Sequence, residues 1–487
     1  MDNSVYNHRR IAKLYLGLGI IVSGVFLVVS LLSPSEIQNS LIFGYSIQRL
    51  ALASLFLISA IVFCLAYFLI HSGRFDRQLE FIAREDLFWI PLSSSILFIV
   101  GLVLVCFNYF QSGGFLTSYL ERLLPFSWWL MILAFGFQVS LAFLSGTSVR
   151  KELVGQLSMV VILTIGAISF TQISLERDVS SEDVFYTYVE GQKIIHGENP
   201  YARVVGEDIR ENDKYAIYFP GFYLLSGASQ AIGLESFEYW IAFWEIIFLS
   251  SALTISVVIF MLYKTKYHLL LSLFGPLFFL FNRWTLHVVR VSEIDFLPLL
   301  ILILALIGIK KGKSSAYLLF GLSLGIKQMG IFLVPLTAIW AWKDRRHSNN
   351  FALVVKRIGL VALIPTILIL PFLVWDAEGF FRSVFISVTR NPSVLGNIFS
   401  LDAYLGFVGF MAKLPMILLF FLVYFASARY NLGVYFSSFL IFIIFAGFNS
   451  VYFPSNFVWV IPFIPLSLLE FLQSRQITTE VSTIVNI

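Results

Sequence analysis

The chain has 487 residues, of which 58% are hydrophobic, 17% aromatic and only 13% charged, with a net charge of +4. A soluble fold cannot cover 51 phenylalanines and 10 tryptophans with so few charges. The composition therefore excludes a soluble globular enzyme, a disordered protein and a nucleic-acid-binding protein, and it indicates that lipid is the main solvent.

Apolar segments recur along the chain at lengths that suit a bilayer, which needs about 20 apolar residues per spanning helix. We therefore predict an all-α polytopic membrane protein with about fourteen transmembrane helices. The predicted spans lie near 11–33, 47–70, 88–110, 126–146, 152–172, 237–262, 267–281, 294–309, 314–326, 329–342, 353–375, 403–425, 432–449 and 455–472.

The lysines and arginines between these segments indicate the orientation, because cytoplasmic loops carry an excess of basic residues. With both termini in the cytoplasm, 20 of the 33 basic residues lie in cytoplasmic loops. This arrangement requires that residues 219–233 form a helix on the outer surface rather than a span. We expect three regions: four accessory helices in 1–150, a functional membrane domain in 151–475 and a cytoplasmic tail in 476–487.

The largest loop, 173–218, is then extracytoplasmic, and it holds 10 of the 29 acidic residues. A carboxylate there can act as a general base, or it can bind a divalent metal. Most of these acids are expected to be simply solvated. Asp183 is the preferred base because it lies close to the membrane beside aromatic residues, and Asp178, Glu182 and Tyr186 are predicted to support it.

A shorter outer loop carries Arg283, His287 and Arg290, which share one face if the segment is helical. Two arginines and a histidine on one face can hold a phosphate by charge-assisted hydrogen bonds. Glu293 and Asp295 follow as the chain enters an apolar segment, where ionisable groups are costly and are candidates for function. An internal ion pair between Arg290 and Glu293 is the competing interpretation.

Lys327 lies between two short apolar segments and far from the cytoplasmic clusters of basic residues. A lysine in that position either extends to the outer interface or binds an anion. We favour the anion, which makes Lys327 a predicted phosphate ligand.

Further polar and aromatic residues stand at the ends of apolar segments, where such side chains either anchor a helix at the membrane interface or line a pocket. The chain contains no dinucleotide-binding, Walker, zinc-protease or serine-hydrolase motif. The candidate pocket residues are Tyr201, Tyr218, Pro220, Arg390, Asn397 and Tyr452.

Taken in order, these motifs resemble the GT-C superfamily of integral membrane glycosyltransferases, and most of all its bacterial polyprenol-phosphate-mannose-dependent mannosyltransferases. The resemblance covers about 152–472. The family has an Asp after a span, a Tyr three positions later, Gly-x-x-Pro-Tyr, Tyr-x-Pro-Pro, Gly-Gln-x-Asp, a helix ending in Lys, and Gly-Asn-x-x-Ser. The matching residues here are Asp183, Tyr186, Gly197–Tyr201, Tyr218–Gly221, Ser292–Asp295, Lys327 and Gly396–Ser400, with Gly221 replacing a Pro and Ser292-Glu293 replacing Gly-Gln.

The resemblance implies a GT-C-like core and an active site on the outer face of a bacterial or archaeal cytoplasmic membrane. The donor would be a sugar on a polyprenyl phosphate, and the acceptor a lipid, a glycan or a protein. Asp183 would be the base of an inverting transfer. Lys327, Arg290 and Arg283, supported by His287, would stabilise the leaving phosphate. No cofactor is expected, although the acidic loop allows a divalent metal.

Two other functions fit the same residues. A transporter or flippase for a lipid-linked saccharide also needs cations for phosphate, but it should show inverted repeats and a site at the membrane midplane. An accessory subunit without catalysis would tolerate replacement of its loop carboxylate.

Overall fold

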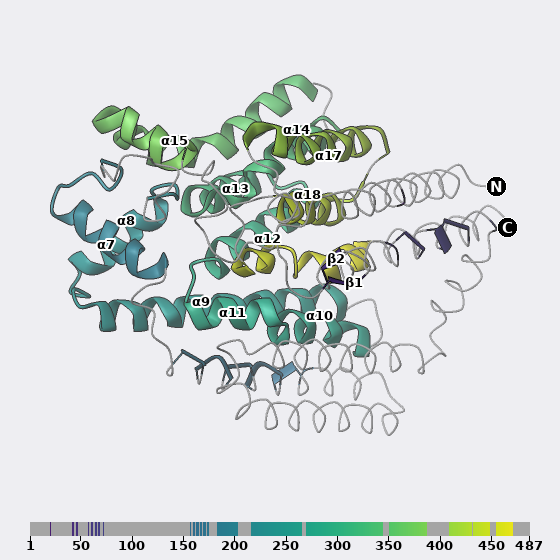
Figure 1. Cartoon of the computed structure of the whole chain (residues 1–487), viewed down its shortest axis with the longest axis horizontal. Coiled ribbons are helices and arrows are strands. Elements are labelled where there is room, and N and C mark those ends of the chain that lie inside the picture. The colour runs from purple at the N-terminus through teal and green to yellow at the C-terminus, as the bar shows by residue number, and fades with distance from the viewer. Residues whose placement is uncertain are drawn as a thin grey trace. The chain divides into compact units, whose positions relative to one another are not determined.

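The computed structural model describes scattered positions up to residue 174 and then the ranges 183–202, 216–264, 269–343, 350–386, 409–430, 432–448 and 454–470. Within these residues the fold is helical, apart from a two-residue antiparallel pairing of β1 (Leu41–Ile42) with β2 (Tyr45–Ser46). The predicted all-α class is thereby confirmed for the described residues. The helices (Figure 1) are α7 (Asp183–Ile195), α8 (Gly221–Ala231), α9 (Phe237–Lys264), α10 (Leu269–Phe281), α11 (Arg283–Val291), α12 (Phe296–Lys310), α13 (Ser315–Ile326), η2 (Gln328–Leu333), α14 (Val334–Trp342), α15 (Asn350–Phe381), η3 (Arg382–Ile386), α17 (Gly409–Tyr430), α18 (Val434–Phe448) and η6 (Pro454–Trp459).

Three helical stretches of the described residues are long and apolar enough to cross a membrane: Phe237–Tyr263, Phe351–Phe385 and Lys413–Tyr430. Several shorter apolar helices accompany them, including α12, α13 and α18. The predicted count of about fourteen spans stays a prediction, because much of the chain before residue 156 lies outside the described residues.

The long helices expose apolar side chains that a water-soluble protein would bury. On α15, Val374 is 81% exposed, Phe351 69% and Ile367 59%. An apolar surface of this extent along one helix is typical of contact with lipid or with another protein. Exposure and length together therefore support a membrane protein.

The chain divides into two compact units, one formed by 1–93, 404–407 and 471–487 and the other by 94–403 and 408–470. The second unit contains α7 to η6 and all the contacts described below. The predicted boundary at residue 150 lies outside the described residues and stays a prediction.

The helices α7 and α8 lie beside each other near the start of α9 (Figure 1) and are joined by buried polar contacts. Ser226 Oγ donates to the carbonyl of Thr187 at 3.1 Å, and Gln230 Nε2 donates to the carbonyl of Tyr188 at 2.9 Å. With 11 residues, α8 is about 16 Å long, roughly half the hydrocarbon thickness of a bilayer. The prediction that 219–233 is not a span stays a prediction, because α13 and α14, which lie in predicted spans, are similarly short.

The end of α7 follows directly from its sequence. Gly197 has φ +75°, Gly197 N–H donates to the carbonyl of Ile194 at 3.1 Å, and Glu198 N–H donates to the carbonyl of Lys193 at 2.8 Å. These bonds satisfy carbonyls that a helix end leaves without partners. A turn at Gly197 therefore ends α7 and leads the chain to Tyr201.

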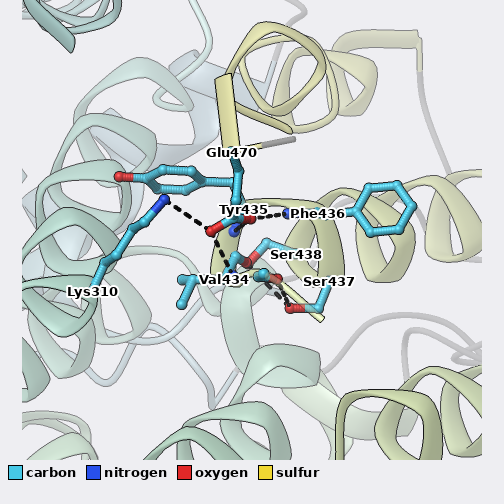
Figure 2. A network of polar contacts seen from close by, with 8 residues as sticks. Lys310, Val434, Tyr435, Phe436, Ser437, Ser438 and Glu470 are labelled. Carbon is cyan, nitrogen blue, oxygen red and sulfur yellow. Dashed lines mark hydrogen bonds and ion pairs between the residues drawn. The ribbon is translucent and has the colours of Figure 1, made fainter. Parts of the chain in front are cut away.

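The N-terminus of α18 is capped by the carboxylate of Glu470, the last residue that the structure describes (Figure 2). Glu470 accepts backbone N–H bonds from Val434 at 3.0 Å, Tyr435 at 3.0 Å and Phe436 at 3.1 Å, and it pairs with Lys310 at 3.0 Å. Lys310 Nζ also lies 4.7 Å from the centroid of the Tyr435 ring. The positive end of a helix dipole and a lysine together stabilise the half-buried Glu470 carboxylate, so this contact joins α12, α18 and the helix at 463–470 to one another.

Candidate functional site

Asp183 is the first residue of α7, where the helix dipole favours a negative charge. The hydroxyl of Tyr218 donates to Asp183 Oδ2 at 3.1 Å. Tyr186, which was predicted to support Asp183, lies one turn along α7 with its ring 5.9 Å from that of Phe185. Tyr218, predicted only as a pocket residue, thus contacts Asp183 directly, and the supporting role of Tyr186 stays a prediction.

Lys327 ends α13 in an extended conformation that turns its side chain into the protein, where it is 1% exposed. Its Nζ lies 2.7 Å from Asp295 Oδ1 and 3.6 Å from Glu293 Oε2. Asp295 is 0% exposed, and the indole N–H of Trp459 donates to the same Oδ1 atom. The lysine is thus held by carboxylates of its own chain, and its predicted role as a phosphate ligand stays a prediction.

Tyr218 connects these two groups. Its hydroxyl bonds Asp183, and the centroid of its ring lies 4.7 Å from Lys327 Nζ, in the range of a cation–π interaction. The structure therefore brings together Asp183, Tyr218 and Lys327, three predicted site residues from distant parts of the sequence. Glu293 and Asp295 join the same cluster through Lys327.

The charges in this cluster do not balance if every group is ionised, because three carboxylates face one lysine. Burial raises the pKa of Glu293 well above its ordinary range, and the neighbouring Asp295 carboxylate raises it further while Lys327 opposes the shift. Burial, and then the nearby Asp183 carboxylate, raise the pKa of Tyr218 well above its ordinary value. Glu293 therefore holds a proton more readily than an ordinary glutamate, and Tyr218 remains a neutral donor to Asp183.

Side chains hold the backbone around Tyr218, which belongs to no helix or strand. The hydroxyl of Tyr201 donates to the Tyr218 carbonyl at 2.8 Å, and the Tyr218 N–H donates to the hydroxyl of Tyr223 at 3.2 Å. On either side of Tyr218, Gln328 Oε1 accepts the N–H of Phe219 at 3.2 Å, and Gln328 Nε2 donates to the carbonyl of Ile217 at 2.6 Å.

The start of α8 packs against the end of α13 with no space between the backbones. A Cβ atom on Gly221 would lie 2.3 Å from the carbonyl oxygen of Gly325 and 3.0 Å from the nitrogen of Ile326. Only glycine permits this approach, which gives a physical reason for Gly221 where the GT-C pattern has proline. The approach also places the residues just before α8 next to Lys327.

Tyr201 and Pro220 were predicted to line a pocket, and both are buried. Tyr201 is 0% exposed and packs its ring against Phe372 at 5.4 Å and Phe380 at 4.9 Å. Tyr201 thus belongs to a hydrophobic cluster that includes Ala216 and Phe219 on either side of Tyr218. The pocket role predicted for Tyr201 and Pro220 stays a prediction.

The predicted cations His287 and Arg290 lie on α11, which begins at Arg283. The segment is therefore helical, which is the condition for these three residues to share one face. Ser292, in the left-handed conformation with φ 50°, ends this helix and leads directly to Glu293. The structure places Glu293 3.6 Å from Lys327, and the competing interpretation, an ion pair of Arg290 with Glu293, stays a prediction.

Five predicted residues lie outside the described part of the chain, so their roles stay predictions: Asp178, Glu182, Arg390, Asn397 and Tyr452. Among the residues that the structure describes, no group of three or more His, Cys, Asp or Glu side chains could hold a metal ion.

Sequence reasoning missed Gln328 and Trp459. Gln328 carried a usable signal, because it follows the buried Lys327 within the glycine-flanked segment Gly325–Gly330. Trp459 carried none, since an indole near the end of an apolar segment is usually an interface anchor.

Fold and site together define a helical protein with helices suited to crossing a membrane and a buried cluster of charged groups between its shorter helices. Comparisons of the chain with protein-family models, with curated proteins and with solved structures gave no significant match.

Proposed function

We propose that this protein is an integral membrane glycosyltransferase of the GT-C type, which moves a sugar from a polyprenyl-phosphate donor to an extracytoplasmic lipid, glycan or protein acceptor. The observation that carries the proposal is the convergence of Asp183, Tyr218 and Lys327 at the meeting point of α7, α8 and α13. A base candidate beside a cation is the arrangement that a transfer with an anionic leaving group needs.

In the proposed reaction a hydroxyl oxygen of the acceptor attacks the anomeric carbon of the donor sugar. The bond from that carbon to the phosphate oxygen breaks, and the configuration inverts. Asp183 takes the proton of the hydroxyl, and polyprenyl phosphate leaves with the bonding electrons.

The negative charge of the leaving phosphate needs nearby cations. Lys327 already faces two carboxylates, which weaken its attraction for a further anion. We therefore expect Arg283 and Arg290, with His287, to provide most of the stabilisation of the phosphate charge. Lys327 contributes the part of its positive charge that Asp295 does not neutralise. No resident metal is part of this proposal.

The proposal includes the predicted topology of about fourteen spans, with both termini in the cytoplasm and the site on the outer face of a bacterial or archaeal membrane. This topology requires that 219–233 is not a span, because counting it as one would invert all later loops.

The decisive experiment gives purified protein a panel of radiolabelled polyprenyl-phosphate sugars together with membrane lipids, and compares wild type with Asp183→Asn. We expect transfer by the wild type and at least about a 100-fold loss in the variant, as for removal of a general base. Glu198→Gln is the matched control, because Glu198 is an exposed acid just beyond the same helix. Equal transfer by wild type and Asp183→Asn would refute the role of Asp183 as the base.

A transporter or flippase for a lipid-linked saccharide is the second candidate. The buried cluster of Lys327, Asp295 and Glu293 favours it, since ionisable groups at membrane depth also mark ion and substrate pathways. Absence of transfer from every donor, together with ATP-independent movement of a lipid-linked saccharide across proteoliposomes, would support this alternative.

A further inference from the structure

Gln328 follows Lys327 directly and binds the backbone on both sides of Tyr218. Its carbonyl oxygen accepts the N–H of Phe219 at 3.2 Å, and its NH₂ group donates to the carbonyl of Ile217 at 2.6 Å. One side-chain amide thus uses its donor and its acceptor on residues 217 and 219, as a neighbouring β-strand would.

The segment that Gln328 binds has no regular structure of its own, so its position depends on such bonds. Tyr201 and Tyr223 also bind the backbone of Tyr218, but they come from the segments that flank it. Gln328 instead comes from the segment that carries the lysine. Its two bonds therefore fix the distance between the tyrosine and Lys327.

We propose that Gln328 is a positioning residue that holds the Tyr218 ring over Lys327 and the Tyr218 hydroxyl on Asp183. Without these two bonds the 216–219 segment moves away from the end of α13. The ring then uncovers the lysine, and the hydroxyl leaves the carboxylate. The positioning of Tyr218 by Gln328 does not depend on the proposed function. Its importance for sugar transfer rests on that proposed function.

The first test is independent of activity and measures how readily Lys327 is acetylated. Purified protein in detergent is treated with an amine-reactive acetyl ester, and peptide mass spectrometry follows the modification of Lys327 over time. Lys327 is 1% exposed in the wild type and should react slowly. In Gln328→Met, which keeps the side-chain volume and removes both bonds, we expect labelling to rise about tenfold, as local opening exposes a buried group.

Two variants calibrate this measurement. Tyr218→Ala removes the covering ring and should give the fastest labelling. Gln230→Met is the matched control, because it removes another glutamine that bonds a backbone carbonyl, at Tyr188, without touching the 216–219 segment. Lys327 should then react as slowly as in the wild type.

Labelling of Lys327 at the wild-type rate in Gln328→Met overturns the proposal, and so does wild-type labelling in Tyr218→Ala. If Gln328→Met does not yield folded protein, Gln328→Asn provides the same test, since its shorter side chain cannot make both bonds. Faster labelling in Gln230→Met as well as Gln328→Met would show general loosening and would also overturn the proposal.

The second test uses transfer kinetics once a donor is found. We expect Gln328→Met to lower kcat by about 10- to 100-fold with little change in KM, which is the effect of displacing a reactive group by about 1 Å. In the Tyr218→Ala background the same substitution should cost nothing more, whereas an additive loss would show that Gln328 does not act through Tyr218. If wild-type protein transfers no sugar, the proposed function fails, while the labelling result still decides whether Gln328 positions Tyr218.

Discussion

Replacing Lys327 with methionine removes the positive charge from a buried cluster and keeps most of the side-chain volume. Asp295, 0% exposed and 2.7 Å from the ammonium, would lose its counter-charge and keep the Trp459 bond. Breaking a buried ion pair by removing one partner costs about 3–5 kcal/mol, because the remaining charge is left uncompensated. We therefore expect Lys327→Met to lower the free energy of unfolding by that amount.

The second substitution in this test is Asp295→Asn, which removes the stranded charge and keeps an oxygen that can accept the Trp459 bond. The double variant should recover the stability to within about 1–2 kcal/mol of wild type, since only hydrogen bonds are then exchanged. The measurement is reversible unfolding by sodium dodecyl sulfate in mixed micelles, followed by tryptophan fluorescence.

Lys413→Met is the control for this experiment. The Lys413 ammonium donates to a neutral acceptor, the carbonyl of Phe448, at 3.2 Å, and the side chain is only half-buried. We expect a loss of about 1 kcal/mol there. Equal losses for Lys327→Met and Lys413→Met, or no recovery on adding Asp295→Asn, would refute the assignment of Lys327 to a buried ion pair.

Two further predictions concern packing and capping. Glu470→Gln removes the charge that accepts three backbone N–H bonds and pairs with Lys310, so the free energy of unfolding should fall by about 1.5–3 kcal/mol. The same loss in a Lys310→Met background would show that the ion pair contributes little. Gly221→Ala places a Cβ 2.3 Å from the Gly325 carbonyl oxygen, so it should cost about 1–3 kcal/mol and also speed acetylation of Lys327.

Gly359→Ala is the control for the glycine prediction. A Cβ on Gly359 would meet nothing within 4 Å, and the residue lies inside α15. We expect it to raise stability by about 0.5–1 kcal/mol, as usual for Gly to Ala in a helix. A Gly221→Ala protein as stable as this control would contradict the close approach of α8 and α13.

Hydropathy located the apolar helices well, because a helix in an apolar environment needs apolar side chains along its whole length, and this signal is local in the sequence. The predicted segments 237–262, 314–326 and 432–449 correspond to α9, α13 and α18. The segment 329–342 is less regular than predicted, since a 3-10 helix (Gln328–Leu333) precedes α14. The predicted end at residue 375 matches the backbone break at Asp376, with φ −156°, although helix resumes beyond it.

Single residues of the site could be chosen from the sequence, but their contacts could not. Asp183 and Lys327 were conspicuous because a charge beside an apolar segment is costly and therefore informative. The partners of Lys327 depend on how α8, α11 and α13 pack, and no local pattern encodes that packing. The resemblance to a known family placed Tyr218 near the site but gave no hint that it bridges Asp183 and Lys327.

The bend in α15 has a consequence for depth in the membrane. The helix has 32 residues, or about 48 Å, while the hydrocarbon layer is about 30 Å thick. The bend falls at Asp376, beside the exposed Trp375 and shortly before the exposed ion pair of Glu378 and Arg382. Such residues suit the boundary between acyl chains and head groups.

Gly379, one turn beyond the bend, lies against the backbone of Tyr201, since a Cβ there would be 2.7 Å from the Tyr201 carbonyl oxygen. Tyr201 in turn bonds the backbone of Tyr218. If α15 crosses a bilayer, this chain of contacts sets the Tyr218 segment level with the head groups. A molecule with a long hydrocarbon tail could then present its polar end to Asp183 while the tail stays dissolved in the membrane.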